Sequence, residues 1–194
     1  MPNPFIDLGR ATLSFIGMVA TPVIAPVGAA LALVHVRSLR SAYKKNFIGI
    51  PKHVADQLQP FYDIKLAEVK YAEFAIVPGL SSDFGAITFG NTIFFTGGIN
   101  YTKREDVRLL IHELEHCRQY DAHGGLYPFL VKYIAQSTLR GTFNVHKYVG
   151  LEREATAKEK ITDDVFPFGK QYTPAIHQNF VMFSSMVAKS DSVQ

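Results

Sequence analysis

The stretch LLIHELEHCRQY, residues 109–120, constrains the fold of this 194-residue chain more than any other feature. Each residue of an α-helix turns by about 100°, so side chains four apart lie only about 40° from each other. His112 and His116 therefore point the same way. The apolar side chains of the same helix gather on the opposite face: Val107, Leu110, Leu114 and Cys117. The sequence thus predicts a helix that packs by its apolar face and turns two imidazoles toward a cleft.

The flanking segments predict an α+β domain around this helix. Thr102 and Glu105 form a capping-box pattern, so the helix is expected to begin just after Thr102, and Gly124-Gly125 is expected to end it. Further helices are predicted at 126–139 and 151–161, with a short one before Pro60. Residues 71–78 and 86–99 are rich in β-branched and aromatic side chains and predict strands of a small antiparallel sheet.

The two histidines predict a metal site. Neutral imidazoles rarely sit side by side in a sheltered space unless a cation lies between them, and zinc accepts such nitrogen ligands. The single cysteine, Cys117, excludes a four-cysteine site, so His and carboxylate side chains would have to hold the metal.

The five residues HELEH leave two candidates for a general base. They satisfy both His-Glu-x-x-His, with Glu113 as the base, and the inverted His-x-x-Glu-His, with Glu115. Arg118 stands three residues after Glu115 and is expected to pair with it. Glu113 is therefore favoured as the residue that would accept a proton.

A hydrolytic zinc site usually has three protein ligands and one open position. The third ligand is expected from the segment VGLEREATAKE, which carries Glu152 and Glu154. These two residues lie about 200° apart on a helix, so only one of them can reach the metal.

The motifs HELEHCRQY, GGLYPFL and LEREA, preceded by AITFGNTIFF, resemble a bacterial family of zinc metallopeptidases related to the DUF4157 group, which is similar to the gluzincins. The resemblance covers roughly residues 70–160. It implies a zincin-like metallopeptidase core that hydrolyses peptide bonds, in which a later helix supplies a glutamate ligand. Carried onto this sequence, it makes His112, His116 and Glu152 the Zn²⁺ ligands and Glu113 the general base. It also implies that Gln119 borders the cleft.

The chain departs from the gluzincin pattern at one position. Thr156 stands where an aspartate often orients a ligand histidine, which leaves the histidine partners open and keeps Glu154 as an alternative ligand. For the tetrahedral oxyanion a further donor is needed, and His146 is preferred over Tyr148, Tyr120 and His123. A substrate strand is expected to pair with the edge of the hairpin at 86–96.

Residues 11–36 form an apolar segment without Asp, Glu, Lys or Arg. We therefore divide the chain into this N-terminal segment, residues 1–45, and a metallopeptidase domain, residues 46–194. The segment is long enough to span a membrane, which would leave the domain on the cytoplasmic side because Arg37, Arg40, Lys44 and Lys45 follow it. A helical hairpin packed on the domain and a signal peptide are the alternatives.

The sequence thus favours a zinc-dependent peptidase that acts on a protein or peptide and associates with a membrane through residues 11–36. One alternative is a non-catalytic, metal-stabilised structural or binding module, or a cargo of a larger assembly. Another is a membrane-active protein. A net charge of +3 without an arginine-rich run argues against a nucleic-acid partner.

Overall fold

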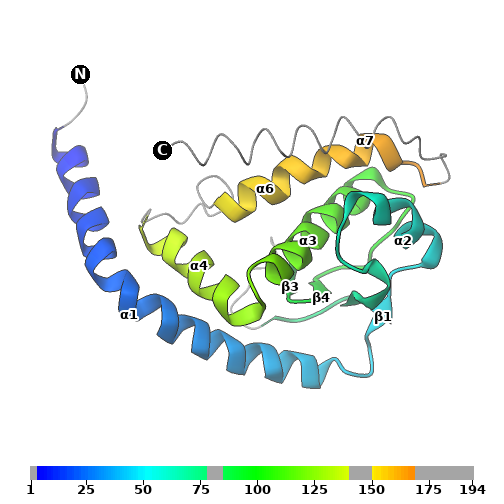
Figure 1. Cartoon of the computed structure of the whole chain (residues 1–194), viewed down its shortest axis with the longest axis horizontal. Coiled ribbons are helices and arrows are strands. Elements are labelled where there is room, and N and C mark those ends of the chain that lie inside the picture. The colour runs from blue at the N-terminus through cyan, green and yellow to red at the C-terminus, as the bar shows by residue number, and fades with distance from the viewer. Residues whose placement is uncertain (1–3, 78–84, 140–149, 169–194) are drawn as a thin grey trace.

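A computed structural model of the chain describes residues 4–77, 85–139 and 150–168, with side chains from residue 22 onward in the first helix and up to residue 136 in the fourth. The helices are α1 (Pro4–Ala42), α2 (Lys52–Leu58), α3 (Arg104–Ala122), α4 (Leu126–Leu139), α6 (Gly150–Lys158) and α7 (Thr162–Val165). Short 3-10 turns lie at Gln59–Phe61 (η1), Leu66–Glu68 (η2) and Glu159–Ile161 (η3). The strands are β1 (Ile48–Gly49), β2 (Lys70–Ala72), β3 (Ala86–Phe89) and β4 (Thr92–Phe95). The predicted α+β class is confirmed (Figure 1).

The four strands form one mixed sheet in the order β1-β2-β4-β3. β3 and β4 make the predicted antiparallel hairpin, and β1 pairs antiparallel with β2. The prediction of a purely antiparallel sheet was wrong, because β2 and β4 are parallel neighbours. The chain leaves β2 through a long connection and adds β3 at the outside, so β4 inserts between them and runs in the same direction as β2.

The sheet is covered on both faces. All four side chains of β4 are therefore buried. Ile93 and Phe95 point into a core shared with the apolar face of α3, which includes Leu110 and Leu114. Phe94, one residue between them, points to the other face and joins a second cluster. This alternation is the ordinary period of a strand buried on both sides.

The second cluster includes residues of the N-terminal helix. Val36 and Leu39 of α1 lie buried with Ala72, Phe89 and Phe94. Residues 4–42 form one helix that continues through Pro22 and Pro26, instead of a helical hairpin. Proline removes a helical hydrogen bond and bends a helix without reversing it, and Figure 1 shows α1 bent along its length.

The start of α3 lies close to the predicted position, but Thr102 does not cap it. The N-cap residue of α3 is Lys103, and its side chain makes no capping hydrogen bond. Asn100 organises this turn instead, since its Oδ1 accepts hydrogen bonds from the Thr102 backbone N (2.9 Å) and hydroxyl (2.7 Å). A short side-chain amide competes well for such local backbone bonds. At the other end, Gly124 and Gly125 have φ of 76° and 112°, and they end α3 as predicted.

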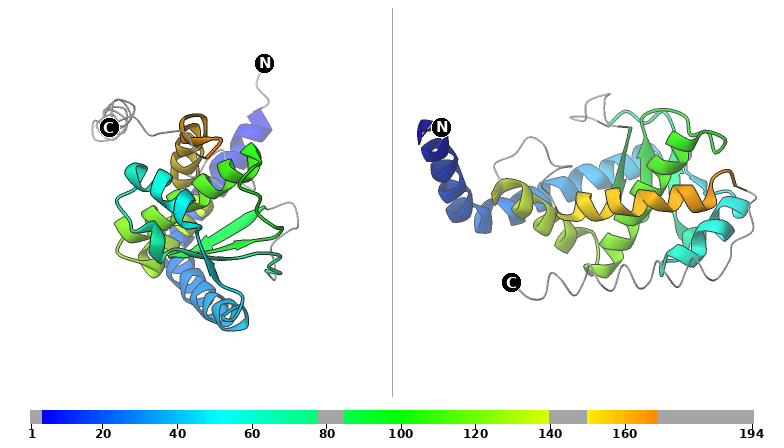
Figure 2. Two further views of the ribbon diagram at one scale, coloured as in Figure 1. Left: turned by 90° about the vertical axis from the view of Figure 1, so that its right-hand side faces the viewer. Right: turned by 90° about the horizontal axis from the view of Figure 1, so that it is seen from above.

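Three helices contact α3: α4, α6 and α7. α4 lies alongside α1, and α6 and α7 run beside α3 (Figure 2). The predicted helix at 126–139 has the bounds of α4, and the one at 151–161 corresponds to α6 followed by η3. The polar side of α3 therefore faces α4 and α6, and this is where the histidines lie.

Candidate metal centre

The two histidines of α3 meet edge to face in a buried position. The ring centroids of His112 and His116 are 4.8 Å apart and the rings are inclined by 82°. Their Nε2 atoms face each other at 3.2 Å, and each residue is only 8% exposed. The four-residue spacing on a regular helix produces this pairing, as the sequence predicted.

Glu152 completes the cluster from the first turn of α6. Its Oε2 lies 3.4 Å from His112 Nε2, and its Oε1 lies 3.5 Å from His116 Nε2. One ligand atom from each of the three residues lies within 4.8 Å of the others. The buried His-His-Glu cluster could therefore hold a metal ion.

Gln119 determines which ring nitrogen of His116 carries the proton. Its Nε2 donates to the Leu151 carbonyl (2.9 Å) and to the Glu154 carboxylate (3.1 Å), both of which only accept. The amide Oε1 is therefore the atom that lies 2.9 Å from His116 Nδ1, and this nitrogen must donate to it. In the neutral ring, the lone pair is then on Nε2, which faces the cluster.

Glu159 has the same effect on His112. Its Oε1 lies 2.9 Å from His112 Nδ1, and an ionised carboxylate can only accept, so Nδ1 donates here as well. Arg108 of α3 holds the other oxygen of Glu159 in an ion pair. Glu159 thus takes the role that is vacant at Thr156, from a position seven residues after Glu152.

These bonds show that the residues fit a metal cation. With both Nδ1 atoms used as donors, the two Nε2 lone pairs and the Glu152 carboxylate all point into one buried space. Such a set of electron pairs repels itself unless a cation or a proton lies between them. A histidine that donates its other nitrogen to a carboxylate or an amide oxygen is the usual arrangement of a metal ligand.

The electrostatics of the cluster without a cation point the same way. Burial lowers the pKa of His116, but its contacts with Glu152 and the charge on Glu113 outweigh burial and raise that pKa to about 9. Burial raises the pKa of Glu152, but its contacts with both histidines hold it well below the usual range. The site therefore keeps its carboxylate ionised and attracts positive charge.

Glu113 is buried one residue from His112 and is held by the sheet. Thr88 of the edge strand β3 donates its hydroxyl to Glu113 Oε2 at 2.7 Å. The negative charge of Glu113 also raises the pKa of both histidines. Thr88 could not be predicted as a partner of Glu113, because a strand pattern does not show which of its side chains contacts a helix.

Glu115 is occupied, as the sequence predicted. Arg118 donates two hydrogen bonds to its Oε1, at 2.8 Å from Nε and 2.6 Å from Nη2. Glu154 lies outside the cluster, half-exposed, and receives the Gln119 amide. Of each pair of candidate glutamates, the structure thus brings Glu113 and Glu152 to the histidines.

Helix α4 covers the cluster. The Tyr133 hydroxyl donates to Glu152 Oε1 at 3.0 Å, and the Phe129 ring packs against His116 with centroids 6.4 Å apart. Burial and the neighbouring Glu152 raise the pKa of Tyr133, so its hydroxyl remains a donor. The apolar pattern of 126–139 predicted the helix, but not that one tyrosine would face the cluster.

None of the predicted oxyanion donors is seen to contact the His-His-Glu cluster within the described residues. His146 and Tyr148 lie outside the described residues. The Tyr120 hydroxyl donates a hydrogen bond to the Thr88 carbonyl (2.9 Å), and His123 Nδ1 donates one to the Gln119 carbonyl (2.7 Å). Within the described residues, Tyr133 is the hydroxyl donor that contacts the cluster.

Comparison with known proteins finds a family match for part of the chain. Residues 49–124 match the family model of the eCIS core domain. This family is DUF4157-like, and its name refers to the extracellular contractile injection system. The resemblance to the DUF4157 group is therefore confirmed over these residues, whereas the metallopeptidase activity and zincin-like core that it implies stay predictions.

The match includes β2, β3, β4 and both histidines, and it ends before Glu152. No curated protein and no solved structure matches the chain.

Proposed function

We propose that the chain hydrolyses peptide bonds with a zinc ion held by His112, His116 and Glu152. The observation that supports this most is a second buried carboxylate, Glu113, fixed by Thr88 beside the cluster. A structural metal site needs no such neighbour, because an uncompensated buried carboxylate is costly.

Two imidazoles and one carboxylate are the ligand set of many hydrolytic zinc sites, which keep one position for water or substrate. When bound, zinc would supply Lewis acidity and lower the pKa of a water molecule toward neutral. Gln119 and Glu159 hold both histidines with Nε2 turned inward, so the ligands are oriented before an ion binds.

Glu113 would take the proton of the attacking water. Thr88 fixes its Oε2, which leaves Oε1 as the oxygen that would accept the proton and later pass it to the leaving amine. The Tyr133 hydroxyl is a candidate donor to the developing oxyanion, next to His146.

The edge strand offers less for substrate pairing than the sequence predicted. β3 is one of the two outer strands of the sheet, but Tyr120 already donates to the Thr88 carbonyl and Arg40 donates to the Phe89 carbonyl at 2.6 Å. A substrate that pairs with β3 would therefore use the backbone groups nearer to Ala86.

The test compares the zinc-loaded full chain with Glu113→Gln on a library of denatured protein substrates. We expect the variant to retain zinc and to lose cleavage by about 10²- to 10⁴-fold, the usual contribution of a general base. Glu105→Gln, an exposed residue of the same helix, is the matched control and should cleave normally. Equal cleavage by the wild type and Glu113→Gln would remove Glu113 as the base.

A metal-stabilised structural or binding module is the second candidate. It is favoured by the burial of both histidines beneath α4 and by the match to the eCIS core domain, whose name refers to a larger assembly. For this function, metal removal would lower the melting temperature, whereas no substrate would be cleaved.

A further inference from the structure

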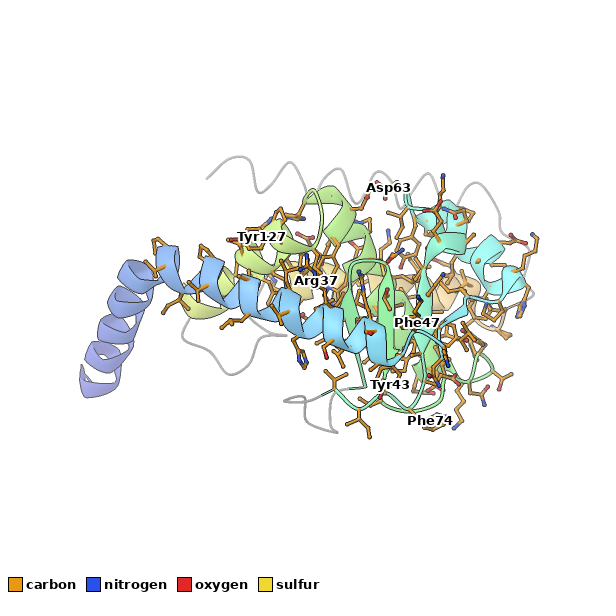
Figure 3. The ribbon with its side chains drawn as sticks, turned by 90° about the horizontal axis from the view of Figure 1, so that it is seen from below. Arg37, Tyr43, Phe47, Asp63, Phe74 and Tyr127 are labelled. Carbon is orange, nitrogen blue, oxygen red and sulfur yellow. The ribbon has the colours of Figure 1, made fainter. Side chains whose placement is uncertain are left out.

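The outer side of α1 carries a row of exposed aliphatic side chains. Between Pro22 and Val34 they are 47% to 68% exposed: Val23, Ile24, Val27, Leu31 and Val34. Figure 3 looks onto this helix, with Arg37 near the middle of the view. Five exposed aliphatic residues on one helix form a contiguous apolar patch, which soluble surfaces rarely present without a partner.

The inner side of α1 is fixed to the rest of the protein. At about 100° per residue, the buried residues Ala25, Ala29, Val36 and Leu39 lie roughly opposite the exposed row. Gly28 approaches Ile134 of α4 so closely that an added Cβ would lie 3.2 Å from its Cδ1. Arg40 further ties α1 to the turn of the hairpin through the Phe89 carbonyl.

From the residue after Asp7 onward, the charged residues of α1 and of the segment that follows it are all basic. Residues 8–55 contain six Lys or Arg and no Asp or Glu, whereas the rest of the chain contains fourteen basic and seventeen acidic residues. The segment therefore has a formal charge of +6 in a chain whose remaining residues sum to −3. Arg37, Lys44 and Lys45 are exposed at the C-terminal end of the aliphatic row.

We propose that the outer side of α1 binds along the surface of a bilayer that contains anionic lipids. The aliphatic row would enter the boundary between headgroups and acyl chains, and Arg37, Lys44 and Lys45 would contact lipid phosphates. A protein partner could cover the aliphatic row. An anionic lipid surface would cover the row and also pair its phosphates with the basic residues that follow it. This inference does not depend on the proposed hydrolysis.

The same packing sets the orientation of the helix. Pro22–Ala42 is long and apolar enough to cross a membrane by length and composition. However, Val36 and Leu39 of this stretch lie in one core with the sheet, so a crossing by Pro22–Ala42 would draw the sheet into hydrocarbon. Binding along the surface leaves the inner side of α1 on the protein.

The test is cosedimentation of the full chain with vesicles of phosphatidylcholine alone or with 30% phosphatidylglycerol. We expect binding to the anionic vesicles and weak or no binding to the neutral ones. Leu31→Glu should weaken binding by at least tenfold, because it places a charge where an aliphatic side chain would be buried. Lys44→Gln with Lys45→Gln should weaken it by about fivefold per charge.

Matched variants lie on other surfaces. Ala67→Glu adds a charge, and Lys65→Gln with Lys103→Gln removes two, all at exposed positions outside α1, and both variants should bind normally. Val34→Glu, at a second position in the aliphatic row, should weaken binding as Leu31→Glu does. An unchanged melting temperature shows that each variant is folded.

Several results would overturn the inference. These are absence of binding to either vesicle, equal binding by Leu31→Glu, and retention on the vesicles in alkaline carbonate, which would indicate a spanning helix. A dimer that Leu31→Glu converts to a monomer, without vesicle binding, would identify the row as a contact between two copies.

Discussion

Glu159 should determine how tightly the cluster binds zinc, although it contributes no ligand atom to it. Its carboxylate accepts from His112 Nδ1 at 2.9 Å, and the side chains of His112 and Glu159 are only 10% and 14% exposed. A sheltered hydrogen bond to a charged group contributes about 1.5–3 kcal/mol, and a neutral one about 0.5–1.5 kcal/mol.

The size of the effect follows from these values. Glu159→Gln keeps an acceptor oxygen but loses the charge, so about 1–1.5 kcal/mol is lost, which is about five- to tenfold in zinc affinity. Glu159→Leu removes the acceptor as well, and we expect about a hundredfold loss, at the upper end for residues that orient a metal ligand. Competition with a chromophoric chelator measures both dissociation constants.

Two further variants separate this role from charge alone. Arg108→Gln removes the ion pair of Glu159 and should have a smaller effect, because Arg108 is largely exposed. Glu105→Gln neutralises an exposed carboxylate of α3 and should bind zinc normally. If Glu159→Leu bound zinc as tightly as the wild type, or if Glu105→Gln lost as much affinity, the assigned orientation of His112 would be incorrect.

Two other predictions concern stability. Because the pKa of His116 is raised to about 9, the metal-free fold holds this proton more tightly than the unfolded chain does. The stability gained is complete below about pH 6.5 and is lost as the pH rises through about 9, so the melting temperature of chelator-treated protein should fall between pH 6 and pH 9. Zinc-loaded protein should become more stable from pH 6 to pH 8, since protons compete with the ion, and the same trend in both forms would contradict this account. Tyr120→Phe leaves the buried Thr88 carbonyl without its donor and should lower the free energy of unfolding in urea by about 1–3 kcal/mol. An unchanged midpoint would show that water replaces the hydroxyl.

Helical periodicity predicted much of the site because it acts over short distances in the chain. The spacing of His112 and His116 determines their common face, and Arg118 can reach Glu115 within one turn. The apolar face of α3 is buried where rotation placed it. These features depend only on helix geometry, which is the same in any fold.

Contacts between elements could not be predicted in this way. Rotation showed that only one of Glu152 and Glu154 could reach the metal, but the choice depends on how α6 packs on α3. The gluzincin pattern places the partner of a ligand histidine at Thr156, four residues after Glu152, whereas Glu159 lies seven residues after it on nearly the same face. The parallel pairing of β2 and β4 likewise depends on the path of a long connection, not on the strands themselves.

The burial of Val36 and Leu39 against the sheet has a practical consequence for work with fragments. The family match begins at residue 49, but the outer face of β4 is covered by a helix that precedes it. A truncated protein that starts at residue 49 would leave the rings of Phe89 and Phe94 open to water and would be prone to aggregate. A fragment that keeps this core therefore has to begin upstream of Val36, within α1.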